Sequence, residues 1–442
     1  MELSQLVEIM RSNGVAGAGG AGFPSYAKLD KRADTIILNC AECEPLLKLH
    51  RQVLETYALE IMSTLAIIAD AVEAEQVIIA IKPSYKGAIE AVKAHLGEYP
   101  KIRIGLLPEI YPAGDEVITI YETTGRVVAP GALPITQGVT VFNVETVYNV
   151  YNAINNSHPV TSKYITIAGE VKNPITLKAP LGITYGELIA LAGGATVDEY
   201  MLVGGGPMTG RIVTESDVVT KTSNAVLVMP KNAYIIQKKT TPLQVNMHRA
   251  MAACCQCHFC TDLCSRHLLG HPIEPHRFMR AISNGQTTDT VAYVNTFFCS
   301  ACGLCEMYSC GQGLSPASMI AQAKANLRKN GVTPPKDVEL KPVNSQRSFR
   351  RVPMERLTAR LGLAKYDVPA PLNDALVAAK DVKIMLSQSI GAPSVAAVKV
   401  GDTVKIGDVV GAAPEGKLGV AVHASIDGVV AEVTDKYVVV RA

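Results

Sequence analysis

The sequence predicts a multidomain protein of mixed α/β and α+β class, and two features of its 442 residues predict that class. In the N-terminal third, short apolar strands alternate with amphipathic helices, which is typical of a mainly parallel sheet. After residue 380, short β-strands separated by glycine turns are typical of a small β module. A chain of this length accommodates about three domains of ordinary size.

Composition narrows the class of protein. Hydrophobic residues make up 48% and the formal net charge is +2, so a large core is available and no charge excess points to nucleic acid or an anionic membrane as partner. The most apolar region, Leu59–Ile81, is interrupted by carboxylates, and residues 1–11 lack a basic start followed by an apolar run. We therefore expect no membrane insertion, no secretory signal and a cytoplasmic protein. Its 11 cysteines then indicate metal or redox chemistry.

Residues 1–158 are predicted to form a Rossmann-like α/β domain. Strands are expected at Thr35–Asn39, Gln76–Ile81 and Lys101–Leu107, with helical spacing across Pro45–Val72 and Ser84–His95 between them. A short amphipathic helix and a glycine-rich loop precede the first strand.

The next segments differ in character. Residues 159–238 read as a compact β-grasp module, with strands at Tyr164–Ala168 and Ala225–Met229 and a helix at Thr184–Ala192. Residues 239–330 hold nine cysteines among helical stretches. Residues 331–376 are rich in proline and are expected to be a linker with one helix near Met354–Leu363. The basic patch Arg347–Arg351 is expected to be a solvated surface of that linker.

Residues 377–442 resemble the barrel-sandwich hybrid fold of lipoyl and biotinyl domains. Those domains carry a modified lysine in a hairpin, whereas the matching turn here, His423–Ile426, has none. We therefore expect a packing or docking role for this module.

Eight cysteines form a duplicated motif. The first copy is Cys254-x2-Cys257-x2-Cys260-x3-Cys264 and the second is Cys299-x2-Cys302-x2-Cys305-x4-Cys310. In two-cluster ferredoxins the fourth cysteine of each motif ligates the other cluster. That rule predicts two [4Fe–4S] clusters, one held by Cys254, Cys257, Cys260 and Cys310 and the other by Cys264, Cys299, Cys302 and Cys305. Structural zinc sites are the alternative, although zinc sites usually pair two separate Cys-x2-Cys units.

Two departures from the ferredoxin pattern affect this motif. Ser265 and Gly311 stand where a proline usually follows the fourth cysteine, and the second copy is one residue longer. These changes can alter cluster potential or stability. The ninth cysteine, Cys255, is expected to be a buried bystander.

A glycine-rich loop and an acidic turn form a second candidate site. The loop Gly17–Pro24 precedes Lys28, and exposed backbone N–H groups of such loops bind phosphate. The turn Asn39–Pro45 lies where the first strand ends, and ligands of open α/β sheets bind outside the carboxyl ends of strands. Cys40 and Cys43 in this turn are read as small buried residues, with a redox pair as the less favoured alternative.

At these two elements the chain resembles a known family. The pattern G-x-G-G-A-G-F-P followed by Lys28 and then N-x-x-E-x-E-P looks like the flavin-binding subunit of respiratory complex I and like the RnfC protein of Rnf electron-transport complexes. Tyr111–Glu116 and Phe142–Thr146 resemble further segments of that family, and Gly205–Gly210 resembles the SLBB-type β-grasp module that follows the flavin domain in RnfC.

The position of the barrel distinguishes among these relatives. RnfC resembles this chain but carries the barrel at its N-terminus, whereas the barrel is the last module of this sequence. That order is similar to the cobalamin reductases of the propanediol-utilisation microcompartment. The resemblance implies FMN, two [4Fe–4S] clusters, NADH as donor and cobalamin as substrate, inside a bacterial microcompartment. A shell protein or an adenosyltransferase is implied as partner, and no nucleic acid.

The resemblance also implies roles for individual residues. The glycine loop and Lys28 would bind the FMN phosphate and ribityl chain, Asn39, Glu42 and Asn143 would face the flavin, and Phe23 and Glu44 would lie on the nicotinamide side. The full set of expected cofactor-binding residues is Gly17, Gly19, Gly20, Gly22, Phe23, Lys28, Asn39, Glu42, Glu44, Asp115, Glu116 and Asn143. Ala41 departs from the family, which often has Asp there, so one flavin hydrogen bond would be missing.

No side chain is expected to act as a general acid or base, because the cofactors carry the chemistry. His267, His271 and His276 are expected to lie at the surface or behind the ligands. Two alternatives stay open: an electron-input subunit of an Rnf-like membrane complex, and a zinc-bound scaffold without catalytic activity.

Overall fold

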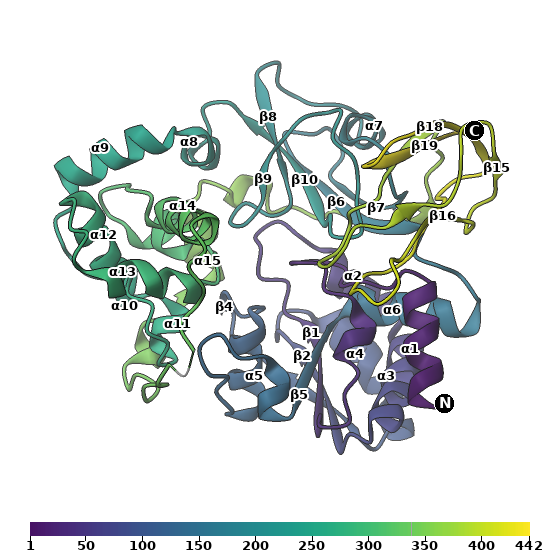
Figure 1. The fold of residues 1–442 in the computed structure, drawn as a ribbon, viewed down its shortest axis with the longest axis horizontal. Helices are drawn as coiled ribbons and strands as arrows, with labels where there is room; N and C mark the ends of the chain where they lie inside the picture. The colour runs from purple at the N-terminus through teal and green to yellow at the C-terminus, as the bar shows by residue number, and fades with distance from the viewer. Residues whose placement is uncertain (337) are drawn as a thin grey trace.

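The computed structural model describes residues 1–336 and 338–442. Figure 1 shows the N-terminal domain at the bottom, the β-grasp module above it, the helical cysteine-bearing module at the left and the C-terminal barrel at the upper right. The multidomain α/β and α+β class predicted from the sequence is therefore confirmed.

The N-terminal domain is built on a parallel sheet with the strand order β3-β2-β1-β5. The strands are β1 (Thr35–Cys40), β2 (Gln76–Ile81), β3 (Ile102–Leu106) and β5 (Val139–Asn143). Ile36 and Leu38 belong to one buried core and Ile37 to another, because successive side chains of a strand point to opposite faces. Helices therefore cover both faces, as an apolar parallel sheet requires.

The helices of this domain lie in two layers. The core on one face packs against α1 (Leu3–Ser12), α2 (Leu49–Thr56), α3 (Ala58–Val72), α4 (Lys86–His95) and α6 (Val144–Asn155), and the core on the other packs against α5 (Glu116–Thr124). Short 3₁₀ turns occupy Ser25–Lys28, Leu96–Glu98 and Pro134–Gln137.

The helix expected over Pro45–Val72 is two helices. Tyr57 leaves helical geometry (φ −123°, ψ 37°), and its ring stacks on Tyr148 with a centroid distance of 4.1 Å. Packing of the Tyr57 ring therefore accompanies the interruption of the helix. Among the described residues no single helix has the length and apolar composition to cross a membrane; α2 and α3 together meet both criteria, but they join at an angle of 89°.

The β-grasp module contains a six-stranded sheet with the order β12-β7-β6-β10-β8-β9. The strands are β6 (Ser162–Gly169), β7 (Ile175–Pro180), β8 (Tyr200–Gly204), β9 (Arg211–Val213), β10 (Ala225–Pro230) and β12 (Leu372–Leu376). Helix α7 (Tyr185–Leu191) begins at a capping box formed by Thr184 and Glu187. The edge strand β12 comes from the segment that the sequence assigned to a linker.

The cysteine-bearing module is helical. Its helices are α8 (Tyr234–Thr240), α9 (Leu243–Ala253), α10 (Phe259–Asp262), α11 (Ser265–Leu268), α12 (Pro275–Ser283), α13 (Thr290–Val294) and α14 (Pro316–Lys329), with shorter turns at Asn295–Phe298 and Cys305–Ser309. A small core of its own, including Phe278, Met319 and Ile320, holds α9, α12 and α14 together.

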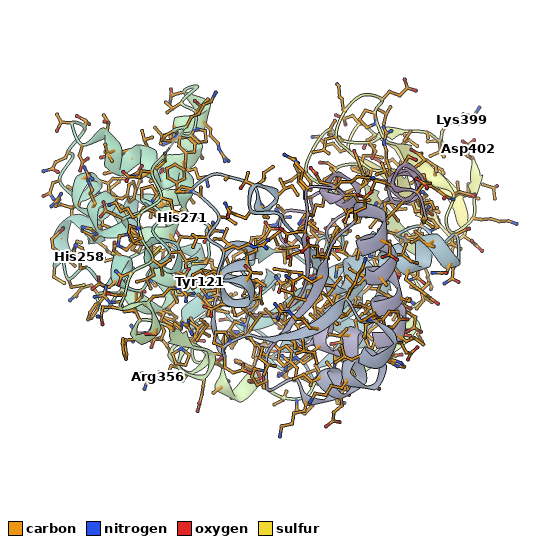
Figure 2. All side chains as sticks on the ribbon, turned by 90° about the horizontal axis from the view of Figure 1, so that it is seen from below. Tyr121, His258, His271, Arg356, Lys399 and Asp402 are labelled. Carbon is orange, nitrogen blue, oxygen red and sulfur yellow. The ribbon has the colours of Figure 1, made fainter. Side chains whose placement is uncertain are left out.

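The expectation that the basic patch is a solvated surface is wrong. Arg347 is 6% exposed and lies with Arg351 against Glu122 of α5, while Arg350 pairs with Asp262 of α10 at 2.8 Å. These acidic partners are far away in the sequence, so local composition could not indicate them. The segment therefore joins the N-terminal domain to the cysteine-bearing module. Arg347 also lies over the ring of Tyr121, which is labelled left of centre in Figure 2.

The rest of this segment is also ordered against its neighbours. Strand β11 (Val352–Pro353) pairs with β4 (Ile110–Tyr111), helix α15 (Met354–Arg360) follows, and 3₁₀ turns occupy Arg347–Phe349 and Ala364–Tyr366.

The C-terminal module is a barrel of two small sheets with the orders β13-β19-β18-β15 and β14-β16-β17. Its strands are β13 (Asp381–Met385), β14 (Val395–Ala396), β15 (Thr403–Val404), β16 (Val409–Ala412), β17 (Val422–His423), β18 (Gly428–Val433) and β19 (Tyr437–Arg441). Lys399 and Asp402 mark its outer end in Figure 2. Its other end lies against the N-terminal glycine loop, where Ile390 is hydrogen-bonded to Gly22.

Candidate functional site

A cavity of about 480 Å³ lies at the carboxyl ends of β1 and β5. The residues expected to bind a cofactor all line it: Gly17, Gly19, Gly20, Gly22, Phe23, Lys28, Asn39, Glu42, Glu44, Asp115, Glu116 and Asn143. The loops after parallel strands meet at this edge of the sheet, which explains how residues from four separate segments come together. We call this space the sheet-edge cavity.

The glycine loop is folded back on itself at the cavity mouth. Gly17 N–H donates to the carbonyl of Phe23 at 2.9 Å, and Ala18 N–H donates to Thr146 Oγ1 at 2.9 Å. Gly20 has φ +58°, and a Cβ built on it would meet nothing within 4 Å. The loop therefore presents bare backbone to the cavity, as a phosphate cradle requires.

Lys28 supplies the cation of this site. Its ammonium lies 3.1 Å from Glu116 Oε1 and donates to the carbonyl of Val141 at 2.8 Å. An ammonium carries three N–H donors, so one N–H remains for an anion in the cavity.

Glu42 and Asp115, like Glu116, are already engaged by the protein. Glu42 accepts from the backbone N–H of His50 at 2.9 Å and of Arg51 at 3.3 Å, at the start of α2. Asp115 caps α5 and pairs with Arg266 of the cysteine-bearing module at 2.8 Å. Both side chains thus fix the walls of the cavity.

The two asparagines hold the ends of β1 and β5. Asn39 donates to the carbonyl of Gly114 at 2.9 Å and accepts from Ala41 N–H at 3.0 Å. Asn143 caps α6, and its Nδ2 lies 3.1 Å from His50 Nε2. Burial lowers the pKa of His50 to about 4, so this imidazole is neutral at physiological pH.

Glu44 joins the N-terminal domain to the β-grasp module. Its carboxylate accepts hydrogen bonds from the N–H of Met208 at 2.8 Å and from the N–H of Thr209 at 2.9 Å. A Cβ on Gly206 would lie 2.2 Å from Glu44 Oε2, so only glycine allows this approach. The expected role of Glu44 on the nicotinamide side remains a prediction, but its oxygens are occupied by the β-grasp loop.

The cysteines of the acidic turn are buried thiols. Burial raises the pKa of Cys40 and raises the pKa of Cys43 to about 12, so both are protonated at neutral pH. Cys43 also lines the sheet-edge cavity.

Sequence reasoning missed several residues of this cavity, among them His50, Thr146, Thr209, Asn224 and Ser300. Asn224 belongs to the β-grasp module, and its Nδ2 lies 2.8 Å from the position that a Cβ on Gly19 would take. Its Oδ1 is buried without a hydrogen-bond partner in the part of the chain that the structure describes. No local motif marks Asn224, because the loop it faces is more than 200 residues away in the sequence.

The C-terminal barrel supports the glycine loop from outside. Ile390 N–H donates to the carbonyl of Gly22 at 3.1 Å. The buried ammonium of Lys221 donates to the carbonyl of Gly14 at 2.7 Å and to that of Ala421 at 2.8 Å. One β-grasp side chain therefore links the start of the loop to the barrel, and burial lowers the pKa of Lys221 to about 7.

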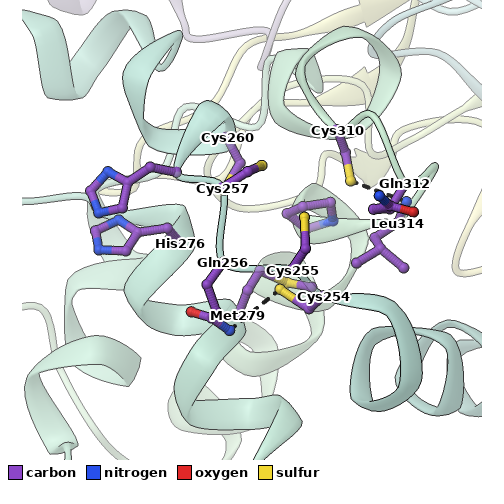
Figure 3. A pocket seen from close by; sticks show the side chains of 12 residues that line it. Cys254, Cys255, Gln256, Cys257, Cys260, His276, Met279, Cys310, Gln312 and Leu314 are labelled. Atoms are coloured by element: carbon purple, nitrogen blue, oxygen red, sulfur yellow. Dashed lines mark hydrogen bonds between the residues drawn. The ribbon is translucent and has the colours of Figure 1, made fainter.

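Four cysteines that do not line the sheet-edge cavity lie around a space of their own (Figure 3). These residues, which we call the outer cysteine group, are Cys254, Cys257, Cys260 and Cys310. Leu314 N–H donates to Cys310 Sγ at 3.3 Å. The group joins three residues of the first motif to the last residue of the second, as the two-cluster rule predicts.

Cys255 lines the same space, but it is exposed, so the expectation of a buried bystander is wrong. The loop around it turns through left-handed residues, Gln256 (φ +57°) and His258 (φ +72°). His276 lies beside this loop and is hydrogen-bonded through Nδ1 to Thr261 Oγ1 at 2.8 Å.

The other four cysteines of the motifs, Cys264, Cys299, Cys302 and Cys305, are called the inner cysteine group. Burial and the repulsion of neighbouring thiolates raise the pKa of Cys302 to about 12 and raise the pKa of Cys305 as well. Cys302 also lines the sheet-edge cavity, and Tyr111 donates its hydroxyl hydrogen to the Cys302 carbonyl. The inner group thus adjoins the cavity.

The residues fit the groups that their patterns imply. A cradle of bare backbone and an ammonium suit the phosphate of a flavin, and the unsatisfied amide oxygen of Asn224 suits a hydroxyl donor such as those of a ribityl chain. Crowded thiols that repel one another as thiolates suit cationic iron, and each iron of a cubane takes one thiolate. No group of three or more Cys, His, Asp or Glu side chains within residues 1–336 and 338–442 is arranged to hold a single metal ion.

Comparison with known families divides the chain into the same modules. The profile of the Nuo51 FMN-binding domain matches residues 10–152, and that of the SLBB domain matches residues 164–212. The 4Fe-4S dicluster domain matches residues 253–315, and the RnfC barrel sandwich hybrid domain matches residues 370–442. The chain thus carries an FMN-binding domain and a 4Fe–4S dicluster domain.

Individual relatives match over different lengths. The chain is similar to cobalamin reductase PduS of Salmonella typhimurium, with 40% identity covering 100% of this chain and 97% of the relative. The same enzyme of Citrobacter freundii is also 40% identical, covering 98% and 95%. A component of the Na+-translocating ferredoxin:NAD+ oxidoreductase complex of Acetobacterium woodii is 30% identical, covering 61% and 59%.

Among solved structures, an NAD+-reducing [NiFe]-hydrogenase in the air-oxidized state has a similar fold. The TM-score is 0.50 at 19% identity, covering 83% of this chain and 68% of that chain.

Proposed function

The chain belongs to the family of the cobalamin reductases PduS, and on that premise we propose that it is a flavin- and iron–sulfur-dependent oxidoreductase that passes single electrons to a corrinoid. The observation that carries the proposal is that Cys302, a member of the inner cysteine group, also lines the sheet-edge cavity. An acceptor of single electrons would therefore lie directly beside the flavin.

We assign the FMN to the sheet-edge cavity. Backbone N–H groups of the loop at residues 17–22, the ammonium of Lys28 and the amide of Asn224 would hold the phosphate and ribityl chain. Asn39 and Asn143 set the positions of the strand ends that the ring would face. When bound, a flavin accepts a hydride and returns the electrons singly.

The two cysteine groups would each hold one [4Fe–4S] cluster, with ligands as predicted by the crossed pairing of the motifs. The protein's part is to keep the inner group against the cavity and to leave one member of the outer group, Cys257, exposed. Backbone N–H groups directed at sulfur, such as Ala301 N–H to Cys299 Sγ at 3.3 Å, would stabilise the charge of a bound cluster.

NADH is the proposed donor. Phe23 lines the cavity and offers an apolar surface for a nicotinamide. Glu44 is held by the β-grasp loop, so it would shape this side of the cavity and leave cofactor contact to Phe23. No step of this reaction requires a general acid or base from the protein.

An electron-input component of an Rnf-like membrane complex is the second candidate. Its support is weaker, because the relatives of that type match only about three fifths of this chain. The family also implies a cytoplasmic setting inside a bacterial microcompartment, with a shell protein or adenosyltransferase as partner, and these remain predictions.

Anaerobic purification followed by spectroscopy tests the proposal. The protein should be brown, should release FMN, and should contain about eight irons per chain. NADH should then drive reduction of hydroxocobalamin, and Cys302→Ala should abolish this reduction while the exposed Cys255→Ala retains it. A colourless, zinc-loaded protein would refute the cofactor assignment. Intact cofactors without cobalamin reduction would refute the corrinoid assignment alone.

A further inference from the structure

The corrinoid must bind next to the cluster that donates electrons to it. The two cysteine groups indicate which cluster that is. The inner group adjoins the sheet-edge cavity through Cys302, whereas the outer group includes Cys257, whose side chain is exposed. Electrons that enter at the cavity would leave from the outer group, whose ligand-type cysteine from the second motif is Cys310. This step rests on the proposed function.

A separate cavity of about 620 Å³ begins directly after Cys310. Its walls are the end of β10 and the start of α8, the loop Gly311–Gly313, and the segment from the end of α15 to Tyr366. We call it the Gly311 cavity. Its volume is typical of small-molecule sites. The loop Gly311–Gly313 forms its floor and directly follows the proposed cluster ligand Cys310 in the chain.

Tyr234, which lines the Gly311 cavity, carries a buried polar atom without a partner. The hydroxyl oxygen of Tyr234 is buried and forms no hydrogen bond with any described residue. Burial raises the pKa of Tyr234, so it stays a neutral hydroxyl that can donate or accept. An unpaired buried hydroxyl destabilises the folded chain. Its oxygen is covered in the unbound protein, so a ligand amide would reach it through a small shift of the tyrosine ring, and the hydrogen bond gained would remove that penalty.

The loop that forms the floor is fixed in place. Lys238 of α8 donates its ammonium hydrogens to the carbonyls of Gly313 and Leu314. A Cβ on Gly311 would meet nothing within 4 Å, and a Cβ on Gly313 likewise. The floor is therefore a held, bare stretch of backbone, against which a flat ring can lie closely.

The charge at the rim is positive. Arg360, the last residue of α15, forms no ion pair with any of the described residues, and Lys365 nearby is paired with Glu170 at 2.9 Å. The cavity lining, within the described chain, contains no carboxylate. A corrinoid combines a flat ring bearing neutral amides with a single anionic phosphodiester, so one unpaired cation and one neutral hydroxyl match its periphery.

We propose that the corrinoid substrate binds in the Gly311 cavity, with the ring edge against residues 311–313, an amide on the Tyr234 hydroxyl and the phosphodiester toward Arg360. Reduction of cob(II)alamin to cob(I)alamin takes one electron and no proton. The site therefore needs nearness to the electron donor and no proton-transferring side chain, which agrees with a lining free of carboxylates.

Three substitutions test this site in the cofactor-loaded full chain. Gly311→Leu fills the cavity without a clash at Cβ, Tyr234→Phe removes only the hydroxyl, and Arg360→Glu reverses the rim charge. Gly97→Leu is the matched control for the first, because a Cβ on Gly97 also meets nothing within 4 Å. Arg356→Glu is the control for the third, since Arg356 lies on the same helix and points outward in Figure 2.

The readouts are the Kd for hydroxocobalamin by equilibrium dialysis and the KM for its reduction, with rates normalised to ferricyanide reduction. We expect Kd to rise about fivefold for Tyr234→Phe and about tenfold for Arg360→Glu, and binding to be lost in Gly311→Leu. With cobinamide, which lacks the phosphodiester, the effect of Arg360→Glu should disappear.

The outcomes separate the two proposals. If the wild type reduces cobalamin but all three variants bind it as the controls do, the Gly311 cavity is refuted and the proposed function stands. If the wild type neither binds nor reduces cobalamin, both are refuted. An equal loss with cobalamin and cobinamide in Arg360→Glu would overturn the assigned phosphodiester contact.

Discussion

Replacing Asn224 by Asp would place a carboxylate where the side-chain amide faces the glycine loop. The two side chains have the same shape, so packing at this buried position is preserved. The Nδ2 atom of Asn224 lies 2.8 Å from the Cβ position of Gly19. One oxygen of the new carboxylate would occupy that place and face any phosphate held by the loop.

The size of the effect has an upper limit that follows from titration. A carboxylate about 4 Å from a phosphate dianion is repelled by roughly 8 kcal/mol at an effective dielectric constant of about 20. The carboxyl group escapes this repulsion by binding a proton, which at pH 7 costs about 4 kcal/mol for an ordinary pKa near 4. The loss of FMN affinity should therefore approach about a thousandfold at pH 7. At pH 5 the cost of protonation falls to about 1.5 kcal/mol, so the loss should shrink to about tenfold.

The assay is titration of the deflavinated protein with FMN, followed by quenching of flavin fluorescence, at pH 5 and pH 7. Riboflavin lacks the phosphate, so its binding should change little. Asn173→Asp is the matched control, because Asn173 Nδ2 stands 2.8 Å from the Cβ position of Gly193 in the same module but outside the cavity. The reasoning is refuted if Asn224→Asp binds FMN like the wild type, or if riboflavin loses affinity equally.

Three further predictions follow from the contacts described above. Gly206→Ala places a methyl group 2.2 Å from Glu44 Oε2 and should weaken FMN binding about tenfold. The variant should lose flavin on gel filtration, and full retention of FMN would contradict the role of this contact. Burial lowers the pKa of Lys221 from 10.5 to about 7. Between these two pH values the unfolded chain carries one more proton than the folded chain, so the free energy of unfolding should rise with pH. Measured by differential scanning fluorimetry, the melting temperature of the wild type relative to Lys221→Met should increase from pH 7 to about pH 9, and a constant difference would argue against this reasoning. Cys310→Ala should lower iron content from about eight to about four per chain while Cys255→Ala leaves it unchanged, and equal iron content in both would contradict the role of Cys310 as a cluster ligand.

Much of the site could be predicted because short-range spacing determines it. The cysteine motifs place thiols on tight loops whatever the surrounding fold, and glycine runs expose backbone wherever they occur. The turns after β1 and β5 had to meet, because parallel strands end at the same edge of the sheet. The resemblance to the flavin-binding family supplied further residues, among them Asp115, Glu116 and Asn143, and all the expected cofactor-binding residues line one cavity.

What could not be predicted depends on contacts between segments far apart in the sequence. Asn224 is an ordinary polar residue until the β-grasp module is placed over the glycine loop. Arg347 reads as part of a solvated patch until Glu122 is seen beneath it. The break at Tyr57 falls inside a continuous helical pattern, and its ring packs on a helix formed about 90 residues later. Local propensity carries no information about such partners.

The contact between Ile390 and the glycine loop has a consequence for how the protein is made. The loop leaves the ribosome more than 350 residues before the barrel segment that closes over it. The FMN site therefore reaches its final form only after the barrel has been synthesised. A chain that stops before residue 388 would carry the whole N-terminal domain but lack the outer support of its cofactor loop. Flavin retention would then act as a check that the barrel had been made and folded.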